Sequence, residues 1–109
     1  MLGAKGGDEG HILENVVFIE LKRRGYDLYV GKIDDMEIDF IAIKDGKTNY
    51  VQVSLSVRDE ATLQRELKPF YSIKDSFPKI LITMDNAPIM YHDGIKQLFA
   101  LDFLNGAEL

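Results

Sequence analysis

The chain of 109 residues is long enough for one domain, and its apolar content of 46% and charged content of 28% are ordinary for a globular protein. It has no cysteine, which excludes disulfides and thiolate metal sites, and no apolar run near the roughly 20 residues of a membrane helix. A net charge of −5 disfavours general nucleic-acid binding, and with no secretory signal the expected location is cytoplasmic.

The N-terminal part of the chain predicts a lead-in and then a helix. Residues 1–9 are rich in glycine and charge, which predicts a flexible lead-in before a single domain over residues 10–109. Apolar residues recur at helical spacing over residues 10–24, and Gly25 is placed to end that helix. Glu14 borders the apolar stripe, so it is either a partly buried functional carboxylate or an ordinary residue at the edge of the stripe.

Three cations in a row close this first helix: Lys22, Arg23 and Arg24. Cations are favourable at a helix C-terminus because they oppose the negative end of the helix dipole. Contact with the phosphates of a nucleic acid is the alternative role of the same cluster. Arg24 also follows Glu20 by four residues, which predicts an ion pair on the solvated face of the helix.

Three strands are expected next, over about residues 27–32, 36–44 and 48–57. An Asp-Gly pair separates the second strand from the third and is typical of a two-residue hairpin turn, because both turn positions favour positive φ. The turn sets Lys44 opposite Lys47. The register that follows gives the hairpin one continuous apolar face, on which Ile38 lies opposite Val53.

The polar face of this hairpin is the most informative feature of the chain. The same register places Asp39 opposite Gln52 and Glu37 opposite Ser54. Opposed side chains have Cβ atoms about 5 Å apart, which is close enough to share one ion. Two acids on one face of a buried strand also repel each other unless a cation relieves them. The arrangement outlines a metal-dependent site.

The second half of the chain predicts a helix and further strands. The helix is expected from about Asp59, as its N-cap, with a kink or break at Pro69. Residues 79–84 indicate an interior strand parallel to the third, followed by a short strand at about 95–99 and a helical turn at about 101–104. The expected order is α-β-β-β-α-β, then a short β and α. Helices should cover both faces of a central mixed sheet of four to five strands, an α/β fold.

This order, with Glu14 on the first helix and Asp39 on the second strand, resembles the PD-(D/E)XK restriction-endonuclease-like fold, a three-layer α/β/α arrangement. The chain is similar in particular to a nuclease-like domain of unknown function found C-terminal to prokaryotic AAA-type ATPases. The resemblance spans about residues 10–105. The matching segments are Gly10-His11-Ile12-Leu13-Glu14-Asn15, Leu21 to Gly25, Glu37-Ile38-Asp39-Phe40, Val51-Gln52-Val53-Ser54 and Gly94-Ile95-Lys96.

The resemblance implies a nuclease site in which Asp39 and position 52 bind Mg²⁺, with support from Glu14, while a lysine at position 54 prepares the attacking water. This chain has Gln52 and Ser54 at those two positions, so a charged ligand and a cation are both missing. Lys32 is one candidate for a relocated lysine. We expect Mg²⁺ binding to be weak or absent, and acid–base help worth about 10²–10⁴ in rate to be lost.

The resemblance also implies a partner, an AAA-type ATPase region ahead of Met1 in the same polypeptide. Nucleic acid is a second candidate partner, no membrane contact is expected, and the sequence leaves the oligomeric state open. The leading hypothesis is an accessory domain with a degenerate nuclease-like site, non-catalytic and acting in partner or nucleic-acid contact. The alternatives are a Mg²⁺-dependent deoxyribonuclease with an altered site, and a structural oligomerisation or regulatory module whose polar face forms internal hydrogen bonds.

Overall fold

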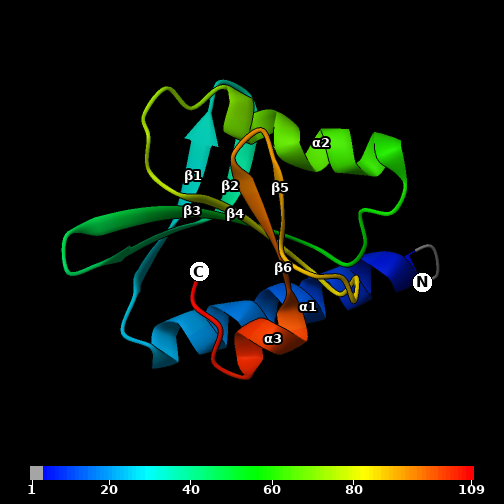
Figure 1. The fold of residues 1–109 in the computed structure, drawn as a ribbon, viewed down its shortest axis with the longest axis horizontal. Coiled ribbons are helices and arrows are strands. Elements are labelled where there is room, and N and C mark those ends of the chain that lie inside the picture. The colour runs from blue at the N-terminus through cyan, green and yellow to red at the C-terminus, as the bar shows by residue number, and fades with distance from the viewer. Residues whose placement is uncertain (1–3) are drawn as a thin grey trace.

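The structure, a computed structural model, describes the backbone of residues 4–109 and the side chains from residue 9 onward (Figure 1). The elements in chain order are α1 (Ala4–Arg23), β1 (Asp27–Ile33), β2 (Met36–Lys44), β3 (Lys47–Ser54), α2 (Glu60–Tyr71), β4 (Lys79–Thr83), β5 (Met90–His92), β6 (Ile95–Phe99) and α3 (Ala100–Leu104). Every predicted element is present. α1 begins at Ala4, earlier than the predicted start, and residues 1–3 of the predicted lead-in lie outside the described residues.

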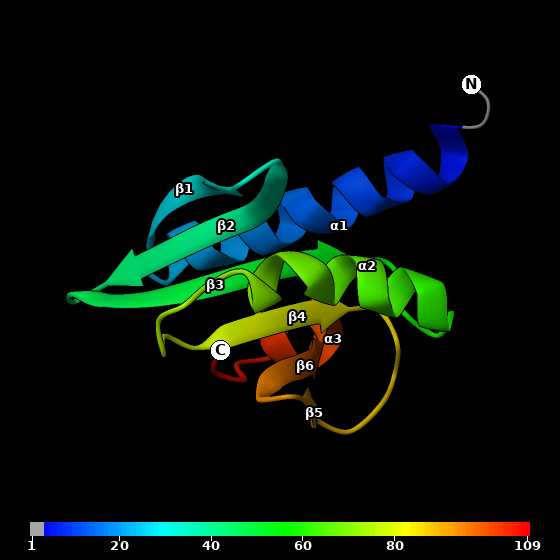
Figure 2. The same cartoon turned by 90° about the horizontal axis from the view of Figure 1, so that it is seen from above.

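The strands form one mixed sheet in the order β1-β2-β3-β4-β6-β5, which Figure 2 shows from top to bottom. Neighbours are antiparallel from β1 to β3, parallel from β3 through β4 to β6, and antiparallel between β6 and β5. The α/β class and the parallel pairing of β3 with β4 are confirmed. The prediction of four to five strands is wrong, because the three-residue strand β5 adds a sixth and is too short to show a strand pattern in the sequence.

The helices cover both faces of the sheet, as predicted: α1 and α3 lie on one side and α2 on the other (Figure 1). The central strand β4 shows why both layers are needed. Its Ile80 and Ile82 belong to the core beside α1, whereas Leu81 belongs to the core beside α2. Alternate residues of a strand point to opposite faces, so an apolar strand of this kind must be buried on both sides.

The predicted turns form as the residue types require. Gly25 ends α1 at φ +94°, a conformation that costs little only for glycine. Asp45 and Gly46 have φ of 53° and 75°, as a two-residue hairpin turn requires. The end of α1 at Gly25 and the hairpin turn at Asp45 and Gly46 were both predicted correctly. The hairpin turn holds β2 and β3 in the register that begins with Lys44 opposite Lys47.

The boundaries of α2 also follow from its sequence. The Asp59 carboxylate accepts hydrogen bonds from the N–H and the hydroxyl of Thr62, which confirms the predicted N-cap. The helix ends at Tyr71, two residues after Pro69, whose ring removes one backbone donor. Over the described part of the chain, no helix combines the length and the apolar character needed to cross a membrane.

Candidate functional site beside Asp39

Strand β2 contains an irregularity at Asp39. Its pairing with β1 shifts between Tyr29 opposite Ile41 and Gly31 opposite Ile38, so that Asp39 and Phe40 together lie opposite a single residue of β1. Two residues against one define a β-bulge, which bends a strand and interrupts its ladder. The ladder between β2 and β3 likewise runs from the hairpin turn only as far as Phe40 opposite Val51.

Side chains replace the missing ladder bonds at this point. The N–H of Asp39 donates to Oε1 of Gln52 at 2.8 Å, and the N–H of Val53 donates to Oδ2 of Asp39 at 2.8 Å. Nε2 of Gln52 donates to the carbonyl oxygen of Glu66 in α2 at 3.3 Å. Asp39 and Gln52 are therefore neighbours, as predicted, but each bonds to the main chain of the other strand.

The bulge overturns part of the predicted apolar face. The pairs from Lys44 opposite Lys47 to Phe40 opposite Val51 are confirmed. The predicted pairing of Ile38 with Val53 is wrong, because Ile38 packs in the core beside α2 while Val53 packs against the core beside α1. An extra residue reverses the alternation of side chains beyond it.

Asp39 borders a pocket of about 430 Å³ between the first half of α1 and α2. The pocket is lined by Gly10, His11, Glu14, Asp39, residues 53–56, Arg65 and Glu66. Glu14 and Asp39 thus share one pocket, as the resemblance implies. Gln52 is only 5% exposed and lies outside this lining.

The electrostatics of the pocket disfavour an ionised Asp39. The pKa of Asp39 is raised to about 6. Burial is the main cause, the Val53 N–H acts against it, and the nearby carboxylates of Glu14, Glu66 and Glu37 add to the rise. The pKa of Glu66 is also raised, chiefly by burial and in addition by Glu14, while Arg65 lowers it. The pocket therefore collects carboxylates with one arginine beside them.

Of the two third-strand positions predicted for the site, Ser54 lines this pocket and Gln52 does not. Ser54, at the lysine position, lines it, and its hydroxyl donates to the carbonyl oxygen of Ser56 at 3.3 Å. Gln52 uses its carbonyl oxygen and its amide nitrogen in the two bonds described above. Within the described residues, no three His, Cys, Asp or Glu side chains are arranged to hold a metal ion. The donor set of Asp39 and Gln52 does not fit Mg²⁺, which prefers several free hard oxygens.

Two pocket residues were missed in the sequence, Arg65 and Glu66. Both lie on the exposed-to-intermediate side of α2, where charged residues are usual. Only the packing of α2 over the end of β3 brings them to Asp39, so the local sequence carries no signal for them. Lys32, the candidate for a relocated lysine, is exposed on β1 with Glu37 as its cross-strand partner, and it lies outside the lining of the pocket.

A buried carboxylate that the sequence did not single out supports the pocket wall. Asp85 accepts hydrogen bonds from the hydroxyl of Ser56 at 2.7 Å and from the N–H of Val57 at 2.8 Å. Nε of Arg58 lies 3.5 Å from the same carboxylate. Asp85 follows β4, so it ties the loop between β3 and α2 to the neighbouring strand and fixes the backbone beside Ser56.

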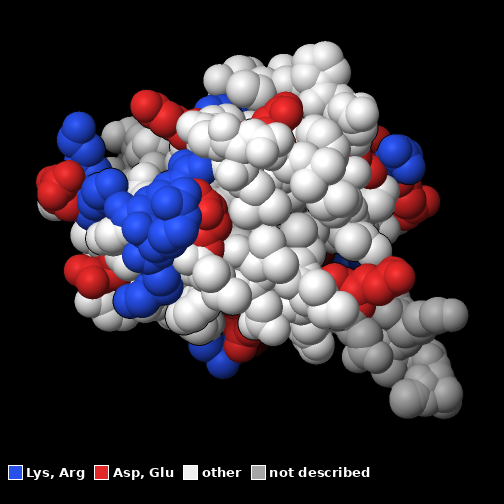
Figure 3. Space-filling view, turned by 90° about the horizontal axis from the view of Figure 1, so that it is seen from below, with Lys and Arg blue, Asp and Glu red and all other residues white. Residues whose placement is uncertain are grey.

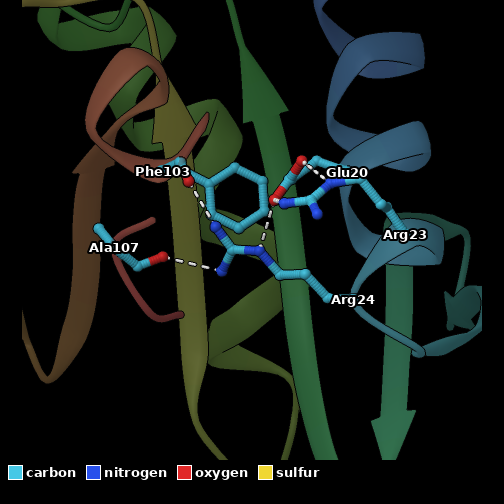
Figure 4. Close-up of polar contacts among 5 residues, drawn as sticks. All are labelled: Glu20, Arg23, Arg24, Phe103 and Ala107. Carbon is cyan, nitrogen blue, oxygen red and sulfur yellow. Dashed lines mark hydrogen bonds and ion pairs between the residues drawn. The ribbon is translucent and has the colours of Figure 1, made fainter. Parts of the chain in front are cut away.

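Arg24, the last of the three cations that close the first helix, contacts the C-terminal part of the chain, which the sequence did not indicate. Arg24 donates through Nε to Glu20 at 2.7 Å, through Nη1 to the Ala107 carbonyl at 2.8 Å, and through Nη2 to the Phe103 carbonyl (Figure 4). Its guanidinium carbon lies 4.2 Å from the centre of the Phe103 ring. Arg24 is therefore a structural residue that anchors α3 and the chain beyond it to α1.

The predicted ion pair between Glu20 and Arg24 is confirmed, but its acid is buried, so the predicted solvated face is wrong. Glu20 is 7% exposed, and hydrogen bonds from Arg23 and then Arg24 lower the pKa of its carboxyl to about 2. The side chain of Arg23 is 69% exposed and Lys22 is exposed. Two of the three residues predicted to contact nucleic acid thus remain at the surface, at the end of α1 away from Glu14.

The fold and the site together define a mixed α/β protein with a carboxylate-rich pocket at a bulged strand. The chain is 43% identical over 103 residues to an uncharacterised protein of Haemophilus influenzae. The aligned region spans 94% of this chain and 25% of that protein. It is 37% identical over 73 residues to the uncharacterised protein MJ1544 of Methanocaldococcus jannaschii. This aligned region spans 62% of this chain and 16% of that protein. No family model and no solved structure matches the chain.

Proposed function

We propose that this chain is an accessory domain with the PD-(D/E)XK restriction-endonuclease-like fold and a degenerate nuclease-like site. The domain is non-catalytic and acts in partner or nucleic-acid contact. One observation carries the proposal: Asp39 and Gln52 exchange hydrogen bonds with the main chain of each other's strands. A pair of metal ligands would instead direct its oxygens to one common point. The bonds of Gln52 repair the break in the sheet at the bulge, which is a structural role.

The proposed partner is an AAA-type ATPase region of the same polypeptide. This part of the proposal rests on the resemblance of the segments around Glu14, Asp39 and Gln52. It is compatible with the size of the two relatives, since the chain spans only 25% and 16% of their lengths. In both relatives the matching sequence is thus a minor part of a longer protein.

The experiment that tests the proposal compares the wild-type chain with the double variant Gln52→Glu, Ser54→Lys. Each is incubated with single-stranded, nicked and branched DNA in Mg²⁺ or Mn²⁺. We expect no metal-dependent cleavage by the wild type and nicking by the double variant, because the variant restores a charged ligand and a cation on one strand. Wild-type cleavage that disappears in Asp39→Ala would overturn the non-catalytic assignment, and a folded but inactive double variant would count against the nuclease-like scaffold.

A Mg²⁺-dependent deoxyribonuclease with an altered site is the first alternative. It is favoured by the gathering of Glu14, Asp39 and Glu66 around one pocket. The pKa values of Asp39 and Glu66 are raised, and pocket carboxylates of that kind are often functional. In that case Glu66 would take the place of the missing ligand at position 52. The cleavage experiment above separates this alternative, because Glu66→Gln would then abolish the wild-type activity.

A structural oligomerisation or regulatory module is the second alternative. It is favoured by the exposed apolar side chains on the outer side of α1 and on the edge strand β1, among them Ile12, Ile19 and Val30, which are 62%, 64% and 70% exposed. Exposed apolar side chains that form a contiguous patch are often partner contacts. Sedimentation of the chain over a range of concentrations distinguishes self-association from a monomer.

A further inference from the structure

A second groove lies at the far end of α1 from the Asp39 pocket. It has a volume of about 760 Å³ and lies between the end of α1, the β2–β3 hairpin, the segment before β4 and the last residues of the chain. Its cations are Arg23, Arg24, Lys44 and Lys47, and its acids are Asp45 and Glu108. We name it the basic groove. Figure 3 shows Lys and Arg side chains gathered at this end of the molecule.

The basic groove differs from the rest of this acidic chain. The formal net charge is −5, yet four cationic side chains and two acidic ones line the groove. Glu20 pairs with both arginines, so the two lysines are the cations that Glu20 leaves available. Lys44 is directly opposite Lys47 in the ladder, and like charges in that position destabilise a hairpin. A bound anion would relieve this repulsion.

The cations of the basic groove have different roles. Arg24 is held by Glu20, Phe103 and Ala107 and serves the fold. Nζ of Lys44 lies 5.4 Å from the ring centre of Tyr26, so its charge is held over the groove wall by a cation–π contact. Together with Lys47, Lys44 is thus a phosphate-binding candidate that the fold itself does not require.

An aromatic side chain adds a second kind of contact. Phe77 lines the basic groove, is 45% exposed, and packs at 6.3 Å between ring centres against Tyr50. An exposed ring beside cations suits an unpaired base next to its phosphates, because every base has a face that can stack. An acidic peptide segment would use the lysines but need not use the ring. The combination favours single-stranded nucleic acid.

We propose that the basic groove binds single-stranded nucleic acid, with Lys44 and Lys47 on phosphates and Phe77 against a base. The inference rests on the nucleic-acid contact in the proposed function and gives that contact a place. Arg23 follows Glu14 by nine residues, which is about 13 Å along the axis of α1. Binding in the basic groove is therefore separate from any chemistry in the Asp39 pocket.

Fluorescence anisotropy of a labelled single-stranded oligonucleotide, measured with the full chain at several salt concentrations, tests the proposal. We expect saturable binding that weakens with salt. Lys44→Gln with Lys47→Gln should weaken it at least tenfold and lower the slope of log Kd against log salt by about 0.7 for each phosphate that the variant no longer neutralises. Phe77→Ala should weaken binding at least fivefold with the slope unchanged, because stacking releases no counterions.

Two controls keep the outcomes distinct. Lys32→Gln with Lys68→Gln removes the same charge from exposed positions outside the basic groove and should bind like the wild type. Asp39→Asn should also bind like the wild type, whereas weakened binding in that variant alone would place the contact at the Asp39 pocket and overturn the inference without touching the proposed function. No saturable binding, equal losses in the two lysine pairs, or equally tight binding of polyglutamate would also overturn it.

Discussion

Replacing Arg24 with alanine should lower the free energy of unfolding by about 3 kcal/mol. The variant loses two hydrogen bonds from a charged donor to the carbonyls of Phe103 and Ala107, and the contact with the Phe103 ring. These contacts join the end of α1 to α3, and the Phe103 ring is fully buried. Urea unfolding followed by circular dichroism at pH 7 measures the change.

Arg23→Ala is the matched control for this prediction. Arg23 pairs with the same carboxylate of Glu20, but its side chain is 69% exposed, and surface ion pairs contribute little. We expect a much smaller loss of stability than for Arg24→Ala. Equal losses in the two variants would mean that the ion pair with Glu20 matters and that the anchoring of α3 does not.

Asp39→Asn should make the protein more stable above pH 6, by about 1–2 kcal/mol. The pKa of Asp39 is raised to about 6 in the folded state, from about 3.9 in an unfolded chain. Between pH 4 and 6 the folded wild type therefore binds more protons than the unfolded chain, and its stability falls as the pH rises. The asparagine carries no charge and can still accept the Val53 N–H. The variant should therefore lose the fall in stability that Asp39 causes between pH 4 and 6.

The pH dependence has other contributors, which the comparison must take into account. Glu66, with its raised pKa, acts in the same direction and remains in the variant, and His11, Glu14 and Arg65 also line the pocket. Asp35→Asn is the matched control, since it removes an exposed carboxylate just before the same strand and Asp35 is not among the carboxylates that raise the pKa of Asp39. Unfolding free energies of the wild type and the two variants, measured at pH 5 and pH 8, show whether Asp39 causes this pH dependence of stability. An unchanged difference between the two pH values in Asp39→Asn would contradict the assignment.

The hairpin shows how far the sequence could predict the site. The Asp-Gly turn correctly set the register from Lys44 opposite Lys47 to Phe40 opposite Val51, because turn chemistry is local. The bulge beyond it was missed, and with it the orientation of Ile38. One signal was available: Gly31, a buried glycine inside a strand, where an added Cβ would meet Ile41 at 2.9 Å.

Contacts between distant elements account for the other differences. Glu66, Asp85 and the carbonyl partners of Arg24 come together only when helices pack on the sheet, so neither periodicity nor spacing could indicate them. Glu20 was expected on the solvated face because a carboxylate there is usual, but two arginines make its burial tolerable. The class, the order of the elements other than β5, and both caps were predictable because they depend on local residue types.

A calorimetric titration of Mn²⁺ into the wild-type chain and into Asp39→Asn tests most directly whether Asp39 and Gln52 complete the sheet or bind metal. Because Gln52 uses its oxygen and its nitrogen on the main chain, we expect no saturable heat that distinguishes the two proteins. Saturable binding by the wild type near one ion per chain, abolished by Asp39→Asn, would contradict the assignment of these two residues to the closure of the sheet.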